Sequence, residues 1–262
     1  MAYKKNKPNK ILKTTHFRKK NSIKKGVFYI FGKHPVIAAL SNPKREKIKL
    51  FVTEHSRSVI SNFLNNHPNL KVEVKDQDFI KNLVDSDNPH QGLVLEVKSL
   101  PNPHLKDVIN CDGKGKNIIL VLDQITDPHN IGAIMRSAAA FNAKAIITTD
   151  RNAPPETGTL AKTASGALDI LPWVRVVNLA ATLDELANNG YWRVGLDGYA
   201  EKSITEIDPG DNIVLVLGSE GKGMRESTQK KCDFLAKLPI SPKVESLNVS
   251  NAAAVALYEL IK

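Results

Sequence analysis

The sequence predicts a two-domain α/β protein that follows a charged N-terminal segment. This prediction rests on a length of 262 residues, a hydrophobic content of 42%, and short apolar runs that alternate with helix-like segments. Such an apolar fraction can build a core, which excludes wholesale disorder. Because domains usually have about 100 to 200 residues, the length favours two of them.

The net charge of +10 originates in the first 25 residues. They contain ten lysines and arginines and no acid, so that 27 basic and 27 acidic residues remain in the rest of the chain. With almost no apolar content, residues 1–25 are predicted to be a disordered basic tail, either simply solvated or an arm that binds phosphates. Ten unbalanced cations favour the phosphate-binding arm over a solvated tail. A mitochondrial transit peptide fits less well, because the segment is rich in lysine and lacks an amphipathic period.

Several classes of protein do not fit this sequence. No stretch approaches the roughly 18 consecutive apolar residues of a membrane span, and the N-terminus lacks the apolar region of a secretory signal. The two cysteines, Cys111 and Cys232, cannot form a disulfide framework and lack metal-ligand spacing. We therefore expect no metal site and a cytoplasmic protein whose thiols have no role.

Residues 26–98 are predicted to form a small α/β domain. After an ordered start at residues 28–32, helices are expected at 35–40, 59–64 and 78–84, and strands at 47–53, 70–74 and 92–97. Residues 99–116 hold two prolines and two glycines with little periodicity, which is typical of an interdomain linker.

Residues 117–262 show longer units. Apolar runs are found at 118–122, 145–147, 174–177, 192–196, 213–217 and 234–240. Helix-like segments separate or follow them at 131–141, 159–167, 179–187, 224–231 and 249–261. Continuous apolar strands between helices indicate a parallel sheet covered on both faces. Ligands of such sheets bind near the carboxyl ends of the strands, so we examine the loops found there.

The first such loop follows the run that ends near Asp123. Asp127 or Asn130 can cap a helix there, and Pro128 suits its opening. Arg136 lies six residues after Asn130, about 9 Å along a helix axis. Since long side chains lean toward the helix start, Arg136 could serve the same cleft as Asn130. A capped helix with a solvated arginine explains the spacing equally well.

Two further loops offer chemistry. Residues 218–224, Gly-Ser-Glu-Gly-Lys-Gly-Met, contain three glycines that permit tight turns, although the spacing fits neither a P-loop nor G-x-G-x-x-G. Ser246, Asn248 and Ser250 offer hydrogen-bonding groups where the last helix begins. That helix is small and apolar on most sides, which indicates packing on both faces against its own fold or a second subunit.

In this order and spacing, the three loops resemble the three motifs of the SpoU (TrmH) family of RNA ribose 2′-O-methyltransferases. Residues 32–36, Gly-Lys-His-Pro-Val, and 90–92, His-Gln-Gly, resemble the ribosomal-protein-like substrate-binding domain of the RlmB-like branch. Asn142 departs from the glycine of many relatives, and Asp169 from a glutamate. Neither residue is one of the motif residues whose side chains are expected to contact substrate.

The resemblance implies an α/β SPOUT methyltransferase domain with a C-terminal trefoil knot, preceded by the substrate-binding domain. It also implies S-adenosylmethionine as cofactor and a homodimer whose active sites lie across the subunit contact. The cofactor would be held in the knot, largely by main-chain groups, at Gly218, Leu238, Ile240 and Leu247.

The same resemblance implies roles for polar residues. Arg136 would activate the ribose hydroxyl; because a guanidinium stays protonated, we prefer that it stabilises the developing oxyanion. Asn130 would position the ribose or Arg136, and Glu220 would orient Arg136 or fix its loop. Ser246 and Asn248 would hydrogen-bond substrate or loop backbone. The histidines of these motifs are expected to be contact or core residues and not general bases.

The implied substrate is a guanosine ribose in large-subunit (23S) rRNA, free or within a ribosome-assembly intermediate. One alternative is a tRNA ribose methyltransferase, a branch that generally lacks the N-terminal domain. The other is a non-catalytic ribosome-assembly factor that binds RNA, against which the intact motif residues argue.

Overall fold

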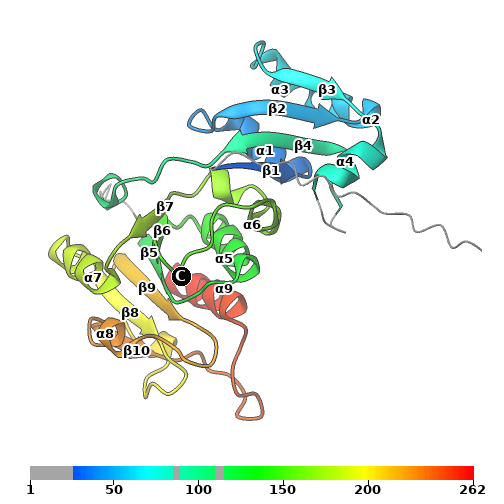
Figure 1. Cartoon of the computed structure of the whole chain (residues 1–262). Coiled ribbons are helices and arrows are strands. Elements are labelled where there is room, and N and C mark those ends of the chain that lie inside the picture. The colour runs from blue at the N-terminus through cyan, green and yellow to red at the C-terminus, as the bar shows by residue number, and fades with distance from the viewer. Residues whose placement is uncertain (1–25, 85–88, 110–114) are drawn as a thin grey trace, which may run out of the picture.

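The computed structural model describes residues 26–84, 89–109 and 115–262. The predicted basic tail and Cys111 lie outside the described residues. Two sheets occupy separate parts of the molecule, and the segment after β4 connects them (Figure 1). Within the described ranges no helix has both the length and the apolar content needed to cross a membrane.

The N-terminal sheet has four strands in the order β1-β4-β2-β3. These are β1 (Val27–Phe31), β2 (Lys47–Val52), β3 (Lys71–Val74) and β4 (Leu93–Lys98). Strand β4 runs antiparallel to both neighbours, whereas β2 and β3 are parallel. The helical elements are α1 (Lys33–Ser41), α2 (Glu54–Arg57), η1 (Ser58–Ile60), α3 (Ser61–Asn65) and α4 (Gln77–Leu83). The helix expected at 59–64 is therefore divided between η1 and α3.

The C-terminal sheet has six parallel strands in the order β10-β8-β9-β5-β6-β7. They are β5 (Asn117–Asp123), β6 (Ala145–Thr149), β7 (Trp173–Val176), β8 (Trp192–Leu196), β9 (Asn212–Gly218) and β10 (Phe234–Ala236). The helical elements are η2 (Leu105–Asp107), α5 (Pro128–Ala140), α6 (Gly158–Ala164), η3 (Ala167–Asp169), α7 (Leu179–Asn188), η4 (Ile204–Glu206), α8 (Glu226–Gln229) and α9 (Val249–Leu260).

Alternate residues of the central strands pack in opposite directions. Ile118, Leu120 and Leu122 join the core that includes α5 and α9, whereas Ile119 and Val121 pack with α7. All five are at most 2% exposed. Helices lie on both sides of the sheet, α5 and α9 opposite α7 (Figure 1). The parallel sheet covered on both faces, predicted from the continuous apolar runs, is confirmed.

The start of α5 and the end of β10 differ from the bounds predicted from the sequence. Asp127 caps α5 by accepting a hydrogen bond from the main-chain N–H of His129 at 2.9 Å, which leaves Asn130 inside the first turn. Strand β10 ends at Ala236, four residues before the predicted end. Pro239 has no N–H to continue the ladder, so the chain leaves the sheet there. The trefoil knot implied by the resemblance stays a prediction.

A buried cluster of charges joins the two domains. The Arg45 guanidinium donates to Glu156 at 2.6 Å and to Asp169 at 2.7 Å, and it also binds the carbonyl oxygen of Lys98. The three side chains are 0%, 6% and 2% exposed, respectively. Burial lowers the pKa of Arg45, but its bonds and charge contacts with both carboxylates outweigh that effect and raise it. The cluster therefore remains charged and fixes one domain against the other.

Candidate functional site

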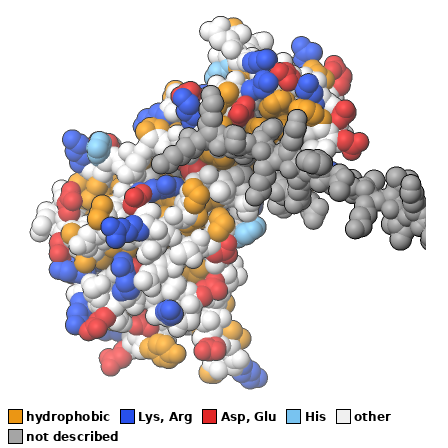
Figure 2. All heavy atoms as spheres, in the orientation of Figure 1, with side chains coloured by type: hydrophobic (Ala, Val, Ile, Leu, Met, Phe, Trp, Pro, Cys, Tyr) orange, Lys and Arg blue, Asp and Glu red, His pale blue; other side chains and the backbone are white. Residues whose placement is uncertain are grey.

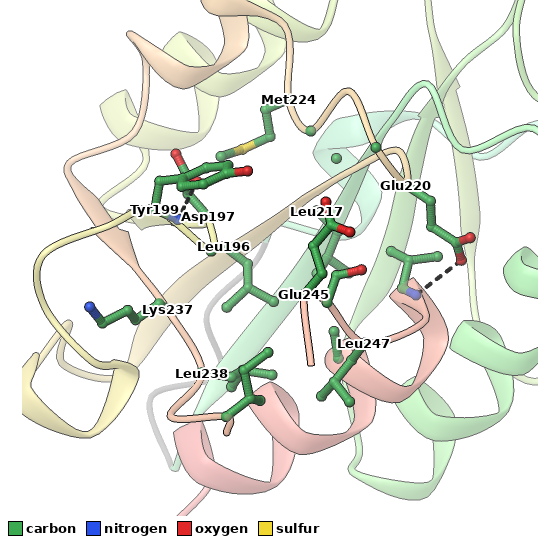
Figure 3. A pocket seen from close by; sticks show the side chains of 18 of the residues that line it. Leu196, Asp197, Tyr199, Leu217, Glu220, Met224, Lys237, Leu238, Glu245 and Leu247 are labelled. Carbon is green, nitrogen blue, oxygen red and sulfur yellow. Dashed lines mark hydrogen bonds between the residues drawn. The ribbon is translucent and has the colours of Figure 1, made fainter. Parts of the chain in front are cut away.

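A cavity of about 610 Å³ opens beyond the carboxyl ends of β8, β9 and β10. Three segments line it: residues 196–199 after β8, 217–224 after β9, and much of 237–249 after β10. Leu196, Leu217, Leu238 and Leu247 gather within this region (Figure 3). Its position is the one expected for a ligand site in a parallel sheet, and its volume suits a small organic ligand.

The glycine-rich loop folds back on itself at one wall of the cavity. Ser219 and Gly223 exchange main-chain hydrogen bonds of 3.1 and 2.9 Å. A Cβ atom added to Gly218 would lie 2.1 Å from the carbonyl carbon of Gly223, so no side chain fits there. Gly221 and Gly223 have φ values of 78° and 66°, which glycine adopts most readily. Close backbone approach explains why this loop is rich in glycine.

Asp123 anchors the far end of this loop. It is fully buried at the end of β5 and accepts hydrogen bonds from the Arg225 main-chain N–H at 2.9 Å and from its Nε at 2.8 Å. Sequence reasoning did not assign this pair a role. An acidic residue that ends an entirely apolar strand was the available signal, because a buried carboxylate needs a partner.

Asn130, Glu220 and Asn248 bring the three loops together. Glu220 Oε1 accepts hydrogen bonds from Asn248 Nδ2 at 2.7 Å, Asn130 Nδ2 at 3.3 Å and the Val249 main-chain N–H at 3.2 Å. Asn248 Nδ2 also lies 3.0 Å from Asn130 Oδ1. Of the two roles considered for Glu220, this geometry supports fixing the loop, since its partners belong to the first and third loops and Arg136 is not among them.

The third loop presents free main-chain groups to the cavity. Asn248 caps α9 by accepting from the Ser250 main-chain N–H at 2.9 Å. The main-chain N–H groups of Leu238, Ile240 and Leu247 donate to no other residue in the described part of the chain. All three residues line the cavity, as does the exposed Ser246. The loop therefore offers a ligand unused hydrogen-bond donors.

Arg136 does not share the cavity of its own chain. It is exposed on α5 and is not among the cavity-lining residues. Asn130 does not line this cavity either, so the expectation that Arg136 serves the same cleft as Asn130 stays a prediction. Six residues along an α-helix turn a side chain about 120° away from the first, and leaning toward the helix start does not reverse that turn.

The loop after β8 adds residues that the motifs did not indicate. Asp197 accepts from Gln229 Nε2 and from the Tyr199 main-chain N–H, both at 2.9 Å. Tyr199, 93% exposed, lies beside Met224 at one side of the cavity (Figure 3). Nothing in the sequence marks this loop, because its residues become neighbours of the second loop only through strand order.

Comparisons with known protein families agree with this architecture. The family model "SpoU rRNA Methylase family" matches residues 117–258. A second model, "RNA 2'-O ribose methyltransferase substrate binding", matches residues 29–103. The first match contains the parallel sheet and all three loops, and the second contains the four-stranded sheet.

Individual relatives cover most of the chain. A protein of Coxiella burnetii named 23S rRNA (guanosine-2'-O-)-methyltransferase RlmB is 37% identical over 234 residues, 88% of this chain and 94% of its own length. YacO of Bacillus subtilis, whose name places it in the TrmH family of tRNA/rRNA methyltransferases, is 37% identical over 89% of this chain and 95% of YacO.

Solved structures show the same fold. The SpoU methyltransferase AviRb from Streptomyces viridochromogenes, solved in complex with AdoMet, superposes with a TM-score of 0.76 at 24% sequence identity, covering 90% of this chain and 89% of AviRb. The fold is therefore that of the SpoU/TrmH SPOUT methyltransferases, an α/β sheet domain behind a substrate-binding domain. Together with the family model and the relatives, it shows that the chain belongs to the SpoU rRNA methylase family.

Proposed function

We propose that the protein transfers a methyl group from S-adenosylmethionine to the 2′-hydroxyl of a guanosine ribose in 23S rRNA. The observation that carries this proposal is the meeting of three loops through Glu220, which lines the cavity and accepts hydrogen bonds from Asn130 and Asn248. The guanosine and the 23S rRNA come from relatives named for that reaction, which are up to 43% identical.

The cavity fits the proposed cofactor. Free main-chain donors at Leu238, Ile240 and Leu247 suit the ring nitrogens and polar edge of an adenosine, and apolar walls suit its flat faces. At Gly218 the main chain lies so close to Gly223 and Met224 that there is no room for a side chain. When bound, S-adenosylmethionine supplies a methyl group activated by a sulfonium. The protein's own contribution is to bind, to orient the hydroxyl and to exclude competing water.

Arg136 is the residue we propose to stabilise the ribose oxygen as it loses its proton. A guanidinium is a cationic hydrogen-bond donor with no acceptor atom, which suits an oxyanion partner and argues against a free base. Since Arg136 is exposed and does not line the cavity of its own chain, we propose that it acts on the cavity of a second copy. Asn130 and Asn248 would position the ribose, with Ser246 donating to substrate from the cavity wall.

An exposed apolar stripe supports the homodimer that this arrangement needs. Val255, Tyr258 and Ile261, at three-residue intervals along and just after α9, are 48%, 53% and 36% exposed. Phe141, which follows α5, packs against Tyr258 with ring centroids 6.1 Å apart and the ring planes tilted by 54°. The stripe thus adjoins the helix that carries Arg136, so one contact could bury the stripe and deliver the arginine.

Replacing the arginine tests this assignment. Arg136→Ala is expected to bind S-adenosylmethionine with parental affinity and to lose methylation by about 10²- to 10³-fold, the usual effect of removing one oxyanion donor. Titration calorimetry measures the binding, and tritium transfer to 23S rRNA measures the activity. Arg136→Lys, which keeps the charge, should retain part of the rate. A parental rate in Arg136→Ala would refute the assignment.

Mapping ribose methylation in cells with and without the gene identifies the substrate. Loss of one guanosine 2′-O-methylation in 23S rRNA is the expected result. Loss of a tRNA mark would instead identify the tRNA alternative, and absence of calorimetric binding to S-adenosylmethionine would favour a non-catalytic assembly factor. A ribosome-assembly intermediate as substrate and the cytoplasmic location stay predictions.

A further inference from the structure

Two motifs of the N-terminal domain have no part in the site described above, yet both face the methyltransferase domain. The main-chain N–H of Lys33 donates to Gln91 Oε1 at 2.9 Å, which joins the motifs to each other. Lys162 of α6 donates to the carbonyl oxygen of Pro89 at 2.8 Å, which joins them to the second domain. A Cβ atom on Gly32 would lie 2.5 Å from Lys162 Nζ, so the contact is close.

From Lys162 this surface continues toward the active site. Thr163 Oγ1 lies 3.5 Å from His129 Nδ1, at the start of α5. His129 precedes Asn130, which contacts Glu220 at the cavity. Arg136 follows His129 by seven residues, nearly two helical turns, and so shares its face of α5. We call this surface the seam; it comprises Lys33, His34, His90, Gln91, Lys162, Thr163 and His129.

The seam carries basic side chains that lack acidic partners. Lys33 and Lys162 form no ion pair with a carboxylate anywhere in residues 26–84, 89–109 and 115–262. Burial, and then the charges of Lys162 and Lys81, lower the pKa of His90, as expected where cations gather. On the outer face of the N-terminal sheet, by contrast, Lys49, Lys71 and Lys75 all surround Glu73.

We propose that the seam binds the phosphate backbone of the substrate RNA, so that one RNA molecule contacts both domains on its way to the reactive groups. This inference rests on the proposed function. The exposed Lys33 has no carboxylate partner, and the Lys162 ammonium has a neutral carbonyl as its hydrogen-bond partner, so both positive charges can still attract phosphate oxygens. The buried Arg45 cluster holds the domains in one orientation. The seam can therefore present a strand to Asn130 of the same chain in a constant register.

Charge removal in the full-length protein tests the proposal. The variants are Lys33→Gln, Lys162→Gln and their double, with Lys162→Arg to keep the charge if the glutamine disturbs packing. Lys71→Gln is the matched control, since Lys71 is an exposed lysine of the same domain that already pairs with Glu73. Binding of transcribed 23S rRNA is measured by filter retention at several salt concentrations, and KM and kcat by methyl transfer.

Each seam variant should reduce the salt slope by about 1 and weaken RNA binding by about 3- to 10-fold, while Lys71→Gln changes neither. KM should rise with kcat within about twofold, and Lys162→Arg should behave as the parent. If the seam variants remain active and lose no more affinity for RNA than Lys71→Gln does, the proposal of RNA binding at the seam is wrong, whereas the proposed function is not affected. If the parental protein binds RNA through the seam but transfers no methyl group, the proposed function is wrong, whereas RNA binding at the seam is supported.

Discussion

Two places in the molecule join segments that are far apart in sequence, and they do so in opposite ways. At the domain junction, the Arg45, Glu156 and Asp169 side chains are at most 6% exposed. Where the three loops meet, Glu220 and Asn248 hold each other at 2.7 Å while remaining exposed. Figure 2 shows that acidic and basic side chains are otherwise interspersed over the visible face.

The difference lies in what each arrangement leaves for a ligand. At the junction every charge is met by an opposite charge or a main-chain group, including the Leu100 N–H that donates to Glu156 at 3.0 Å. At the site, the main-chain donors of Leu238 and Ile240 are unused. A charge cluster whose groups are all paired fixes the orientation of the two domains. The site instead combines a defined geometry with hydrogen-bond donors that are still available to a ligand.

The largest expected effect comes from opening the junction. Arg45→Met leaves two buried carboxylates without their cation, which typically costs about 3 to 5 kcal/mol. Urea unfolding followed by circular dichroism measures the free energy of unfolding. The control Lys230→Met breaks an i,i+4 pair with Glu226 whose side chains are 72% and 79% exposed, so it should cost at most about 0.5 kcal/mol. Equal costs in the two variants would show that the junction adds no more than a surface pair.

The next effect concerns the backbone of the site. Gly218→Ala places a methyl group against the Gly223 carbonyl carbon and must move the loop, an overpacking that costs about 1 to 3 kcal/mol. Calorimetry should show S-adenosylmethionine affinity reduced by about tenfold or more. Gly198→Ala is the control, because Gly198 also lines the cavity but has nothing within 4 Å of an added Cβ. Similar affinities in both variants would contradict the close approach.

A smaller effect is expected from removing only the charge that ties the loops. Glu220→Gln keeps an acceptor oxygen but replaces a charged acceptor with a neutral one, a difference of about 1 kcal/mol. Methyl transfer should fall by about fivefold, and the free energy of unfolding should fall by at most about 1 kcal/mol. Glu226→Gln, an exposed carboxylate outside the site, should keep the parental rate. An unaffected rate in Glu220→Gln would show that hydrogen bonding suffices without charge.

Local sequence rules anticipated much of this molecule. The alternation of apolar runs and helices predicted the parallel sheet. Residue type limited the cap of α5 to Asp127 or Asn130, and the structure shows that it is Asp127. Asn142, which replaces the usual glycine, has φ of 56°. Asparagine tolerates that left-handed conformation better than most residues, so the departure preserves the turn.

What sequence reasoning missed depends on contacts across long separations. Asp169, the second departure from relatives, binds Arg45 of the other domain, 124 positions away, and no periodicity connects them. Asn130 and Arg136 lie six residues apart on α5, so their side chains project about 120° apart around the helix axis. The spacing of the motifs identified residues that come together, but the direction in which each side chain points can be read only from the structure.

Cys232 tests how tightly the chain packs next to Met224, which lines the cavity. The Cys232 sulfur and the Met224 methyl group would each lie 2.8 Å from a Cβ atom added to Gly195, and burial raises the pKa of the thiol to about 12. The neutral thiol is a poor nucleophile, so iodoacetamide should label Cys232 at pH 8 about 10³-fold more slowly than an ordinary thiol of pKa about 8.5. Mass spectrometry of a Cys111→Ser variant measures the rate. Because the thiolate fraction keeps growing below the pKa, the rate should rise about tenfold per pH unit from pH 8 to 10. A labelling rate that stops rising below pH 10 would mean that water reaches the sulfur and that Cys232 is not buried.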